Sequence, residues 1–153
     1  RYCDFLSRGI VCGILARTKS RAPVAKGSVL KEIASWGMEI KIVKDQINRK
    51  ELMHIAEEQF GDFVKAVVDI EQGIMAIGGE LHADEEVLLA EQCNSKREYI
   101  WGINIYPGKS GEEAVEFDSL INIKPARGNS SRGVNDPEIR NKVMSVVKKL
   151  ISE

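Results

Sequence analysis

The sequence is poor in cysteine, histidine and aromatic residues, and each shortage excludes a class of protein. Only Cys93 of the three cysteines lies beyond residue 37, so residues 38–153 cannot form an internal disulfide and a reducing cytoplasm is the expected compartment. No cysteine pair has the spacing of a zinc site, and the chain has only two histidines. Aromatic residues make up 6% of the chain, too few for the stacking platforms that bind single-stranded nucleic acid.

Long apolar runs and the common nucleotide-binding motifs are also missing. The apolar stretch at residues 9–16 is far shorter than the roughly 20 residues of a membrane span, and no cleavage pattern of a signal peptide follows it. Gly108-Lys109-Ser110 resembles the end of a phosphate-binding P-loop, but Ile103 stands where that motif requires glycine. We therefore expect neither membrane insertion nor a P-loop, and the sequence leaves the identity of any cofactor unknown.

The charge of the chain changes sign near residue 38. Residues 1–37 contain seven Lys and Arg against two acidic residues, whereas residues 38–153 contain fifteen against twenty-one. The first segment is either a basic leader or sequence upstream of a natural start at Met38, and the second interpretation is favoured. We expect residues 1–37 to be a basic extension outside the fold and residues 38–153 to form one domain. The acidic balance of that domain makes nucleic acid an unlikely partner.

Two helices are predicted from capping and periodicity. Asn48, with Glu51 three residues later, forms a capping box before an apolar stripe that ends at Gly61. Near the C-terminus, Asp136 is a helix cap and Pro137 occupies the first helical position. The stripe that follows consists of Ile139, Val143, Val146, Val147, Leu150 and Ile151.

The remaining segments are typical of an antiparallel sheet. Residues 39–44 alternate like a strand, residues 63–70 and 74–77 form a hairpin, and two further strands span 99–106 and 115–123. Residues 83–91 have helix propensity but also precede a turn and a strand, so both a helix and a strand are open there, and the strand is favoured. The sequence thus predicts an α+β fold, in which an antiparallel sheet of four to six strands carries an N-terminal helix and a C-terminal amphipathic helix.

Several of these segments together resemble a known family. The order VVDIEQGIMAIGGELHAD, WG, INIKP, GNSSR, DPEIR, between about Met38 and Leu150, is similar to a family of small bacterial proteins known as a domain of unknown function. The resemblance implies membership of that family and no activity.

One short segment, from Gly78 to Asp84, concentrates the chemistry. If it is extended, Glu80, His82 and Asp84 point to the same face, and His82 could act as a general base oriented by either carboxylate. The alternative, which is favoured, is that His82 donates a hydrogen bond to a backbone carbonyl while both acids stay solvated. Three ligands would leave a metal site incomplete, so no metal is predicted. Gly78 and Gly79 either admit a ligand close to the backbone or simply turn the chain.

A basic loop at residues 124–133 is the second candidate region. Arg127, Asn129 and Arg132 precede the C-terminal helix, whose free N–H groups favour an anion. The same arginines could instead form ion pairs within the fold with Glu80 or Asp84. Asn104 lies on the strand face opposite Trp101, where it could line a shallow pocket together with the His82 segment.

Two functional hypotheses follow from these candidates. The first is a non-catalytic binding or regulatory module with a small anionic ligand, dimeric through an exposed sheet edge. The second is a small hydrolase-like enzyme that uses His82 with Glu80 or Asp84 and an arginine-lined anion site. A concave pocket containing His82 and an arginine would favour the enzyme, and a flat surface there would favour the module.

Overall fold

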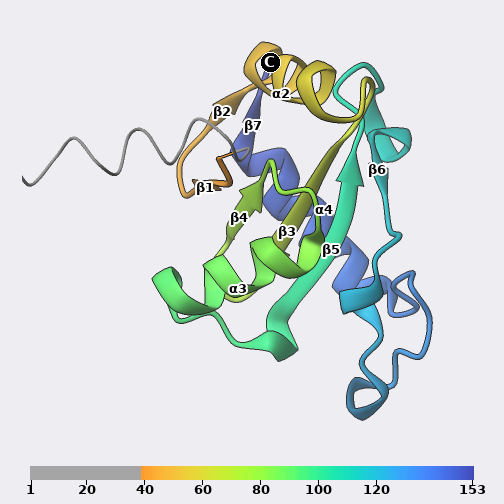
Figure 1. Cartoon of the computed structure of the whole chain (residues 1–153). Coiled ribbons are helices and arrows are strands. Elements are labelled where there is room, and N and C mark those ends of the chain that lie inside the picture. Colours follow the sequence, from red (N-terminus) through yellow and green to blue (C-terminus); the bar gives the residue numbers. More distant parts are fainter. Residues whose placement is uncertain (1–38) are drawn as a thin grey trace, which may run out of the picture.

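The sheet is the central layer of the molecule. The computed structural model describes residues 39–153, in which five antiparallel strands lie in the order β1-β4-β3-β5-β6 (Figure 1). The α+β class and the antiparallel sheet predicted from the sequence are therefore confirmed. The strands are β1 (Lys41–Val43), β3 (Val64–Asp69), β4 (Ile74–Ile77), β5 (Ile100–Ile105) and β6 (Val115–Glu116).

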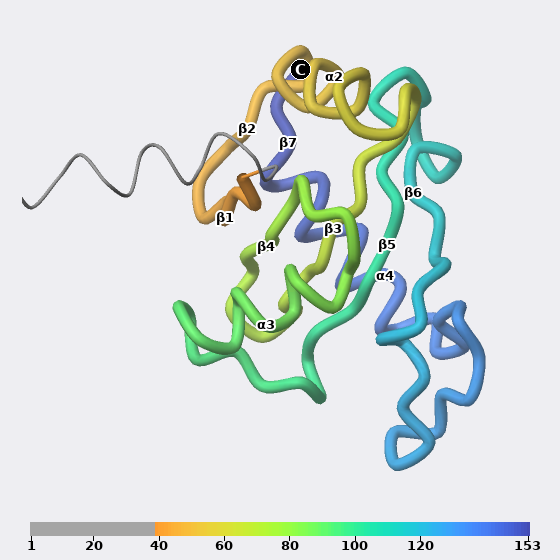
Figure 2. Tube along the Cα trace, in the orientation of Figure 1, coloured from red at the N-terminus to blue at the C-terminus, as the bar shows by residue number. Residues whose placement is uncertain are grey.

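Three α-helices surround this sheet in the part of the chain that the structure describes. They are α2 (Arg49–Gln59), α3 (His82–Cys93) and α4 (Pro137–Leu150). The helices α3 and α4 cover opposite faces of the sheet, and α2 lies at the end where β3 begins (Figure 1). A short parallel pair of strands, β2 (Ile47–Asn48) and β7 (Ile151–Ser152), joins the segment before α2 to the segment after α4 (Figure 2). No helix among residues 39–153 combines the length and the apolar character that crossing a membrane would require.

The C-terminal helix forms for the reasons that its sequence indicates. The carboxylate of Asp136 accepts a hydrogen bond of 2.8 Å from the backbone N–H of Glu138, and Pro137 fits the first turn because its missing N–H would have no helical partner. Burial of each large apolar side chain of the stripe contributes about 1.5–3 kcal/mol. The buried residues are Val143, Val146, Val147 and Leu150.

Strand alternation divides the core into two parts. Trp101, Ile103 and Ile105 point to the α4 face and join the larger apolar cluster, as the sequence predicts. The α3 face has a smaller cluster, and Gly102 and Asn104 lie on that side of β5. The smaller cluster consists of Val67, Ile74, Ala76, Leu89, Ile100 and Ile121.

The interpretation of residues 83–91 as a strand is wrong, because they belong to α3. Spacings of three and four place His82, Glu85, Leu89 and Cys93 on one side of this helix, and Glu85 and Leu89 are buried. Two of those four residues are polar, so the helix has no continuous apolar stripe to indicate it.

The strand predicted at residues 115–123 is only partly present. Pairing with β5 ends at Glu116, and residues 120–122 form a single 3-10 turn. The side-chain amide of Asn122 then takes the place of a strand, because it accepts a hydrogen bond from the N–H of Gly102 and donates one to its carbonyl, both 2.8 Å long. The prediction that residues 1–37 lie outside the fold concerns residues beyond the described range, and it stays a prediction.

Candidate functional site

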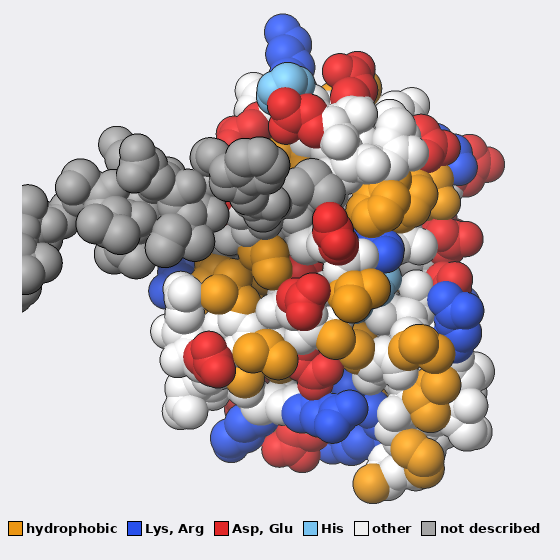
Figure 3. All heavy atoms as spheres, in the orientation of Figure 1, with side chains coloured by type: hydrophobic (Ala, Val, Ile, Leu, Met, Phe, Trp, Pro, Cys, Tyr) orange, Lys and Arg blue, Asp and Glu red, His pale blue; other side chains and the backbone are white. Residues whose placement is uncertain are grey.

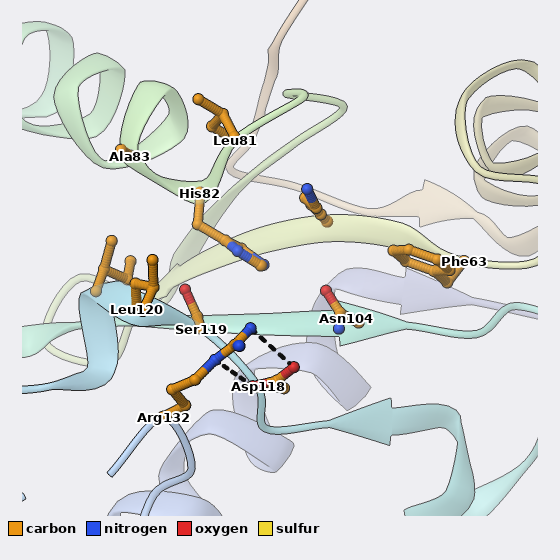
Figure 4. A pocket seen from close by; sticks show the side chains of 11 residues that line it. Phe63, Leu81, His82, Ala83, Asn104, Asp118, Ser119, Leu120 and Arg132 are labelled. Carbon is orange, nitrogen blue, oxygen red and sulfur yellow. Dashed lines mark hydrogen bonds and ion pairs between the residues drawn. The ribbon is translucent and has the colours of Figure 1, made fainter. Parts of the chain in front are cut away.

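A cavity of about 420 Å³ opens on the α3 face of the sheet. Its walls come from the first turn of α3, from β3 and β5, and from the segment that follows β6 (Figure 4). The structure brings together three of the residues predicted from sequence, His82, Asn104 and Arg132. The full lining is Phe63, Lys65, Leu81, His82, Ala83, Asn104, Asp118, Ser119, Leu120, Ile121 and Arg132.

His82 is the first residue of α3 and reaches down toward β5. Its Nε2 lies 2.8 Å from the carbonyl oxygen of Ile103, and since a carbonyl can only accept, Nε2 carries the proton. Burial lowers the pKa of His82, and the bond to Ile103 only partly offsets this effect. The imidazole is therefore neutral at physiological pH, and its Nδ1 is an acceptor without a hydrogen-bond partner among residues 39–153. The bond to a backbone carbonyl is the arrangement that the sequence favoured.

Asn104 has a second unpaired acceptor, which is buried in the wall of the cavity. Its Nδ2 donates a 2.9 Å hydrogen bond to Glu116, which also accepts a 3.0 Å bond from the hydroxyl of Tyr106. These two bonds lower the pKa of Glu116, so this carboxylate is ionised and acts only as an acceptor. The Oδ1 of Asn104 is buried and has no partner among the described residues.

Ser119 forms the floor of the cavity beside Gly102. A Cβ added to Gly102 would lie 2.5 Å from the Ser119 Oγ and 2.6 Å from its Cβ, so only glycine fits at this position of β5. The Ser119 hydroxyl is buried without a hydrogen-bond partner in the described part of the chain. Sequence analysis did not select Ser119, because its position depends on the Asn122 side chain that ends the sheet.

Arg132 and Asp118 form an ion pair at the rim of the cavity. The Nε of Arg132 lies 2.7 Å from one carboxylate oxygen of Asp118, and its Nη2 lies 3.0 Å from the other (Figure 4). Arg132 thus pairs with Asp118, not with Glu80 or Asp84 as the sequence suggested. The Nζ of Lys65, another lining residue, donates a 2.6 Å bond to the backbone carbonyl of Glu80.

The other basic candidate, Arg127, lies elsewhere. Its guanidinium stands 3.9 Å from Glu98 and faces the ring of Tyr99, outside the cavity. The N-terminus of α4 offers no free anion site, because the carboxylate of Asp136 caps it and Glu138 follows in the first turn. The loop before α4 is nevertheless well ordered internally. The side chain of Asn129 cross-links this loop: it donates hydrogen bonds of 2.7–3.0 Å to three backbone carbonyls and accepts one of 2.9 Å from the N–H of Asn135. Asn129 does not line the cavity.

The expectation that Glu80, His82 and Asp84 share a face is wrong, because the chain becomes helical at His82. Glu80 and Asp84 are exposed and neither lines the cavity. No three His, Cys, Asp or Glu side chains gather around a possible metal position within residues 39–153. Gly78 has a φ of +90°, and its carbonyl accepts a hydrogen bond from Gln59, so it turns the chain out of β4.

Glu85 is the buried acid that sequence analysis did not single out. Its side chain is fully buried below the first turn of α3, where one oxygen accepts a 2.9 Å bond from the N–H of Gly79. The other oxygen has no partner among residues 39–153, and burial raises the pKa of Glu85 to about 8. A Cβ on Gly79 would lie 2.8 Å from the Glu85 Cγ, which explains the glycine. Glu85 would have stood out if the helix had been assigned, since it is three residues from His82 and four from Leu89.

Comparison with known proteins identifies the chain at the level of its family. No curated protein and no solved structure matches it. A family model does match, over residues 41–150, a range that contains every element of the sheet and every residue lining the cavity. The chain therefore belongs to the family described as protein of unknown function (DUF5674).

Proposed function

We propose that this domain is a binding module that takes a small organic anion in the cavity beneath α3. The observation that carries the proposal is the unpaired Oδ1 of Asn104, which is buried in the cavity wall. A buried acceptor without a donor costs about 1–3 kcal/mol, and a ligand that supplies the donor recovers that cost. Natural structures keep few such atoms, and they concentrate where a ligand or an ordered water completes the hydrogen bonds.

The charge and lining of the cavity indicate the kind of ligand. Lys65 and Arg132 are cationic, Asp118 is anionic and His82 is neutral, so the lining has a surplus of one positive charge. The remaining wall is largely apolar and suits a hydrocarbon or aromatic body. Outside the cavity the same face mixes hydrophobic, acidic and basic side chains (Figure 3). The apolar lining residues are Phe63, Leu81, Ala83, Leu120 and Ile121.

Amide chemical shifts in a titration with three compounds test this proposal. Benzoate and phenylacetate should shift the amide signals of His82, Asn104 and Ser119, whereas benzylamine, of similar size but cationic, should not. Replacement of Lys65 by Met should weaken phenylacetate binding, because it removes the surplus charge and keeps the aliphatic stem. Lys44→Met is the matched control, since Lys44 is exposed and outside this cavity. Equal shifts by benzylamine, or no shifts with any compound, would refute the proposal.

A hydrolase-like enzyme is the second candidate, favoured by one observation. A neutral histidine with an unpaired Nδ1 lines a concave cavity that also contains an arginine, and a general base needs a free acceptor of this kind. The enzyme nevertheless ranks second, because the group that orients His82 is the carbonyl of Ile103 and neither Glu80 nor Asp84 lines the cavity. Hydrolysis of p-nitrophenyl acetate tests this candidate. A rate above background that disappears in His82→Gln would support it, and an equal rate in that variant would exclude His82 as the base.

The dimer predicted from sequence is a further proposal about assembly. The sheet edges are β1, with three residues, and β6, with two, and neither pairs with a further strand of the described chain. Light scattering after size-exclusion chromatography tests this proposal. A mass of one chain at all concentrations would refute it.

A further inference from the structure

We infer that the ligand of this cavity is a small carboxylic acid whose apolar body also carries a hydroxyl or amide N–H, and that this group donates its hydrogen bond to the Oδ1 of Asn104. The inference rests on the proposed function and adds the chemical class of the ligand. The class of ligand depends on whether the oxygen or the nitrogen of the Asn104 amide is free to bind it, and the residues around Asn104 determine which one is free.

Glu116 fixes the orientation of the Asn104 amide. Its carboxylate is ionised and cannot donate, so the amide end that faces it at 2.9 Å must be the Nδ2 group. The hydroxyl of Tyr106, 3.0 Å from the same Glu116 oxygen, holds that carboxylate in place. The oxygen end of the amide is therefore left without a donor in the wall of the cavity.

His82 imposes the same preference from the opposite wall. Its Nε2–H is used by the Ile103 carbonyl, so the only free ring nitrogen is an acceptor. The cavity thus has two acceptors, one from β5 and one from α3, and the hydroxyl of Ser119 can adapt to either role. A ligand with acceptors alone would leave Asn104 and His82 unpaired.

The donor on the ligand is a neutral group, not an ammonium. Asn104 has two direct cross-strand neighbours, Lys65 on β3 and Glu116 on β6, so a cation and an ionised carboxylate already flank the amide. Arg132 at the rim is paired with Asp118, which leaves Lys65 as the lining cation without a carboxylate partner among residues 39–153. Hydroxyls and amide N–H groups satisfy Asn104 without adding a further charge between Lys65 and Glu116, and a carboxylate elsewhere on the ligand matches the charge of Lys65.

Calorimetry with two matched pairs of compounds tests the inference. Mandelate is compared with phenylacetate, and 3-(4-hydroxyphenyl)propionate with 3-phenylpropionate, so that the hydroxyl is close to the carboxylate in one pair and remote in the other. In at least one pair the hydroxylated acid should bind about tenfold more tightly, the ratio expected for one added hydrogen bond to a buried acceptor. In Asn104→Leu the same ratio should fall to about one.

Glu116→Gln gives a second test that does not remove the amide. A glutamine at this position can donate to Asn104, which allows the Asn104 amide to turn and present its Nδ2 to the cavity. The preference should then weaken or reverse, so that 3-(4-methoxyphenyl)propionate, which only accepts, gains on the hydroxylated compound. Glu113→Gln, at an exposed position outside the cavity, is the control and should keep the original preference.

The outcomes separate this inference from the proposed function. If phenylacetate and 3-phenylpropionate bind as tightly as their hydroxylated partners, the cavity binds anions but the donor assignment is wrong. A hydroxyl advantage that persists unchanged in both Asn104→Leu and Glu116→Gln would also overturn it. If no acid binds and the amide titration is silent as well, the proposed function fails together with the inference.

Discussion

The two faces of the sheet are built from the same strands but have opposite chemistry. The face under α4 contains the large apolar cluster, including Trp101 and Val143, and the cavity of about 340 Å³ beside it is lined mainly by α4, α2 and the end of β5. The face under α3 buries Glu85, Asn104 and Ser119 beside only six apolar residues. Apolar burial under α4 therefore stabilises the fold, whereas the unpaired buried oxygens of Glu85, Asn104 and Ser119 under α3 lower its stability. This division agrees with placing the candidate site on the α3 face.

The largest effect should come from a charge on the α4 face. Val143 is fully buried, and Val143→Asp places an unpaired carboxylate among apolar side chains, which should lower the free energy of unfolding by about 3–5 kcal/mol. Urea unfolding measures the loss. Asn141→Asp, on the exposed side of the same helix, should change stability by about 0.5 kcal/mol or less. A Val143→Asp protein of unchanged stability would show that α4 does not pack on the sheet in solution.

The next largest effect should be a pH dependence of stability that comes from Glu85 on the α3 face. The folded-state pKa of Glu85 is about 8, above its ordinary value of 4.5, so the folded protein binds the proton more tightly than the unfolded chain. Its contribution to stability is complete below pH 4.5 and is lost as the pH rises to about 8. Lys65 opposes this rise in pKa and Asp84 adds to it, and both contribute less than burial does.

The variant Glu85→Gln should remove this pH dependence. Relative to the parent protein it should gain stability between about pH 5 and pH 8, on the order of a few kcal/mol, because glutamine does not ionise. Thermal melts at several pH values measure the difference, with the exposed Glu91→Gln on the same helix as control. Parallel pH curves for Glu85→Gln and the parent would mean that Glu85 is already ionised in the fold.

A smaller effect is expected where the α3 face is packed most tightly. Gly102→Ala forces its new Cβ against Ser119, which should cost about 1–3 kcal/mol by overpacking. Ser119→Gly removes the atoms that the new Cβ would strike. The double variant should therefore lose less free energy of unfolding than the sum of the losses in the two single variants. Urea unfolding of the four proteins gives the coupling energy. Strict additivity would indicate that Gly102 is required for another reason.

The smallest effect should come from the rim of the cavity. Arg132 and Asp118 are both substantially exposed, and Arg132→Ala should therefore lower stability by no more than about 1 kcal/mol. The same variant should weaken the thermal stabilisation that phenylacetate gives to the parent protein, because one cation of the cavity is lost. If phenylacetate does not stabilise the parent protein, and Arg132→Ala lowers stability equally with and without it, there is no anion site at Arg132.

The α4 face could be predicted from sequence because its residues follow simple patterns. Asp136 and Pro137 mark the start of α4, its apolar residues recur with helical spacing, and Trp101 alternates with Gly102 along β5. Each of these signals is local, and tertiary packing reinforces it.

The α3 face could be predicted only in part, because its elements depend on side chains that replace apolar residues or backbone. Glu85 occupies an inward position of α3 where an amphipathic helix normally has an apolar residue, so the sequence lacks the helical pattern of apolar residues and favours a strand instead. Asn122 substitutes for strand backbone opposite Gly102, so β6 is shorter than its sequence suggests. The sequence did identify His82, Asn104 and Arg132 as candidates, but it did not identify Asp118 and Ser119, which line the cavity from the segment between β6 and Asn122.

The pairing of β2 with β7 has a consequence for how the chain folds. Ile47 pairs with Ile151, and α4, which covers the larger apolar cluster, comes after every strand of the main sheet. During synthesis the strands therefore emerge from the ribosome before the helix that shields their apolar face. Contacts between such distant positions also slow the search for the native arrangement. Folding of this domain should thus be completed only after residues 137–152 have been synthesised, and until then the nascent chain exposes the surface most prone to aggregation.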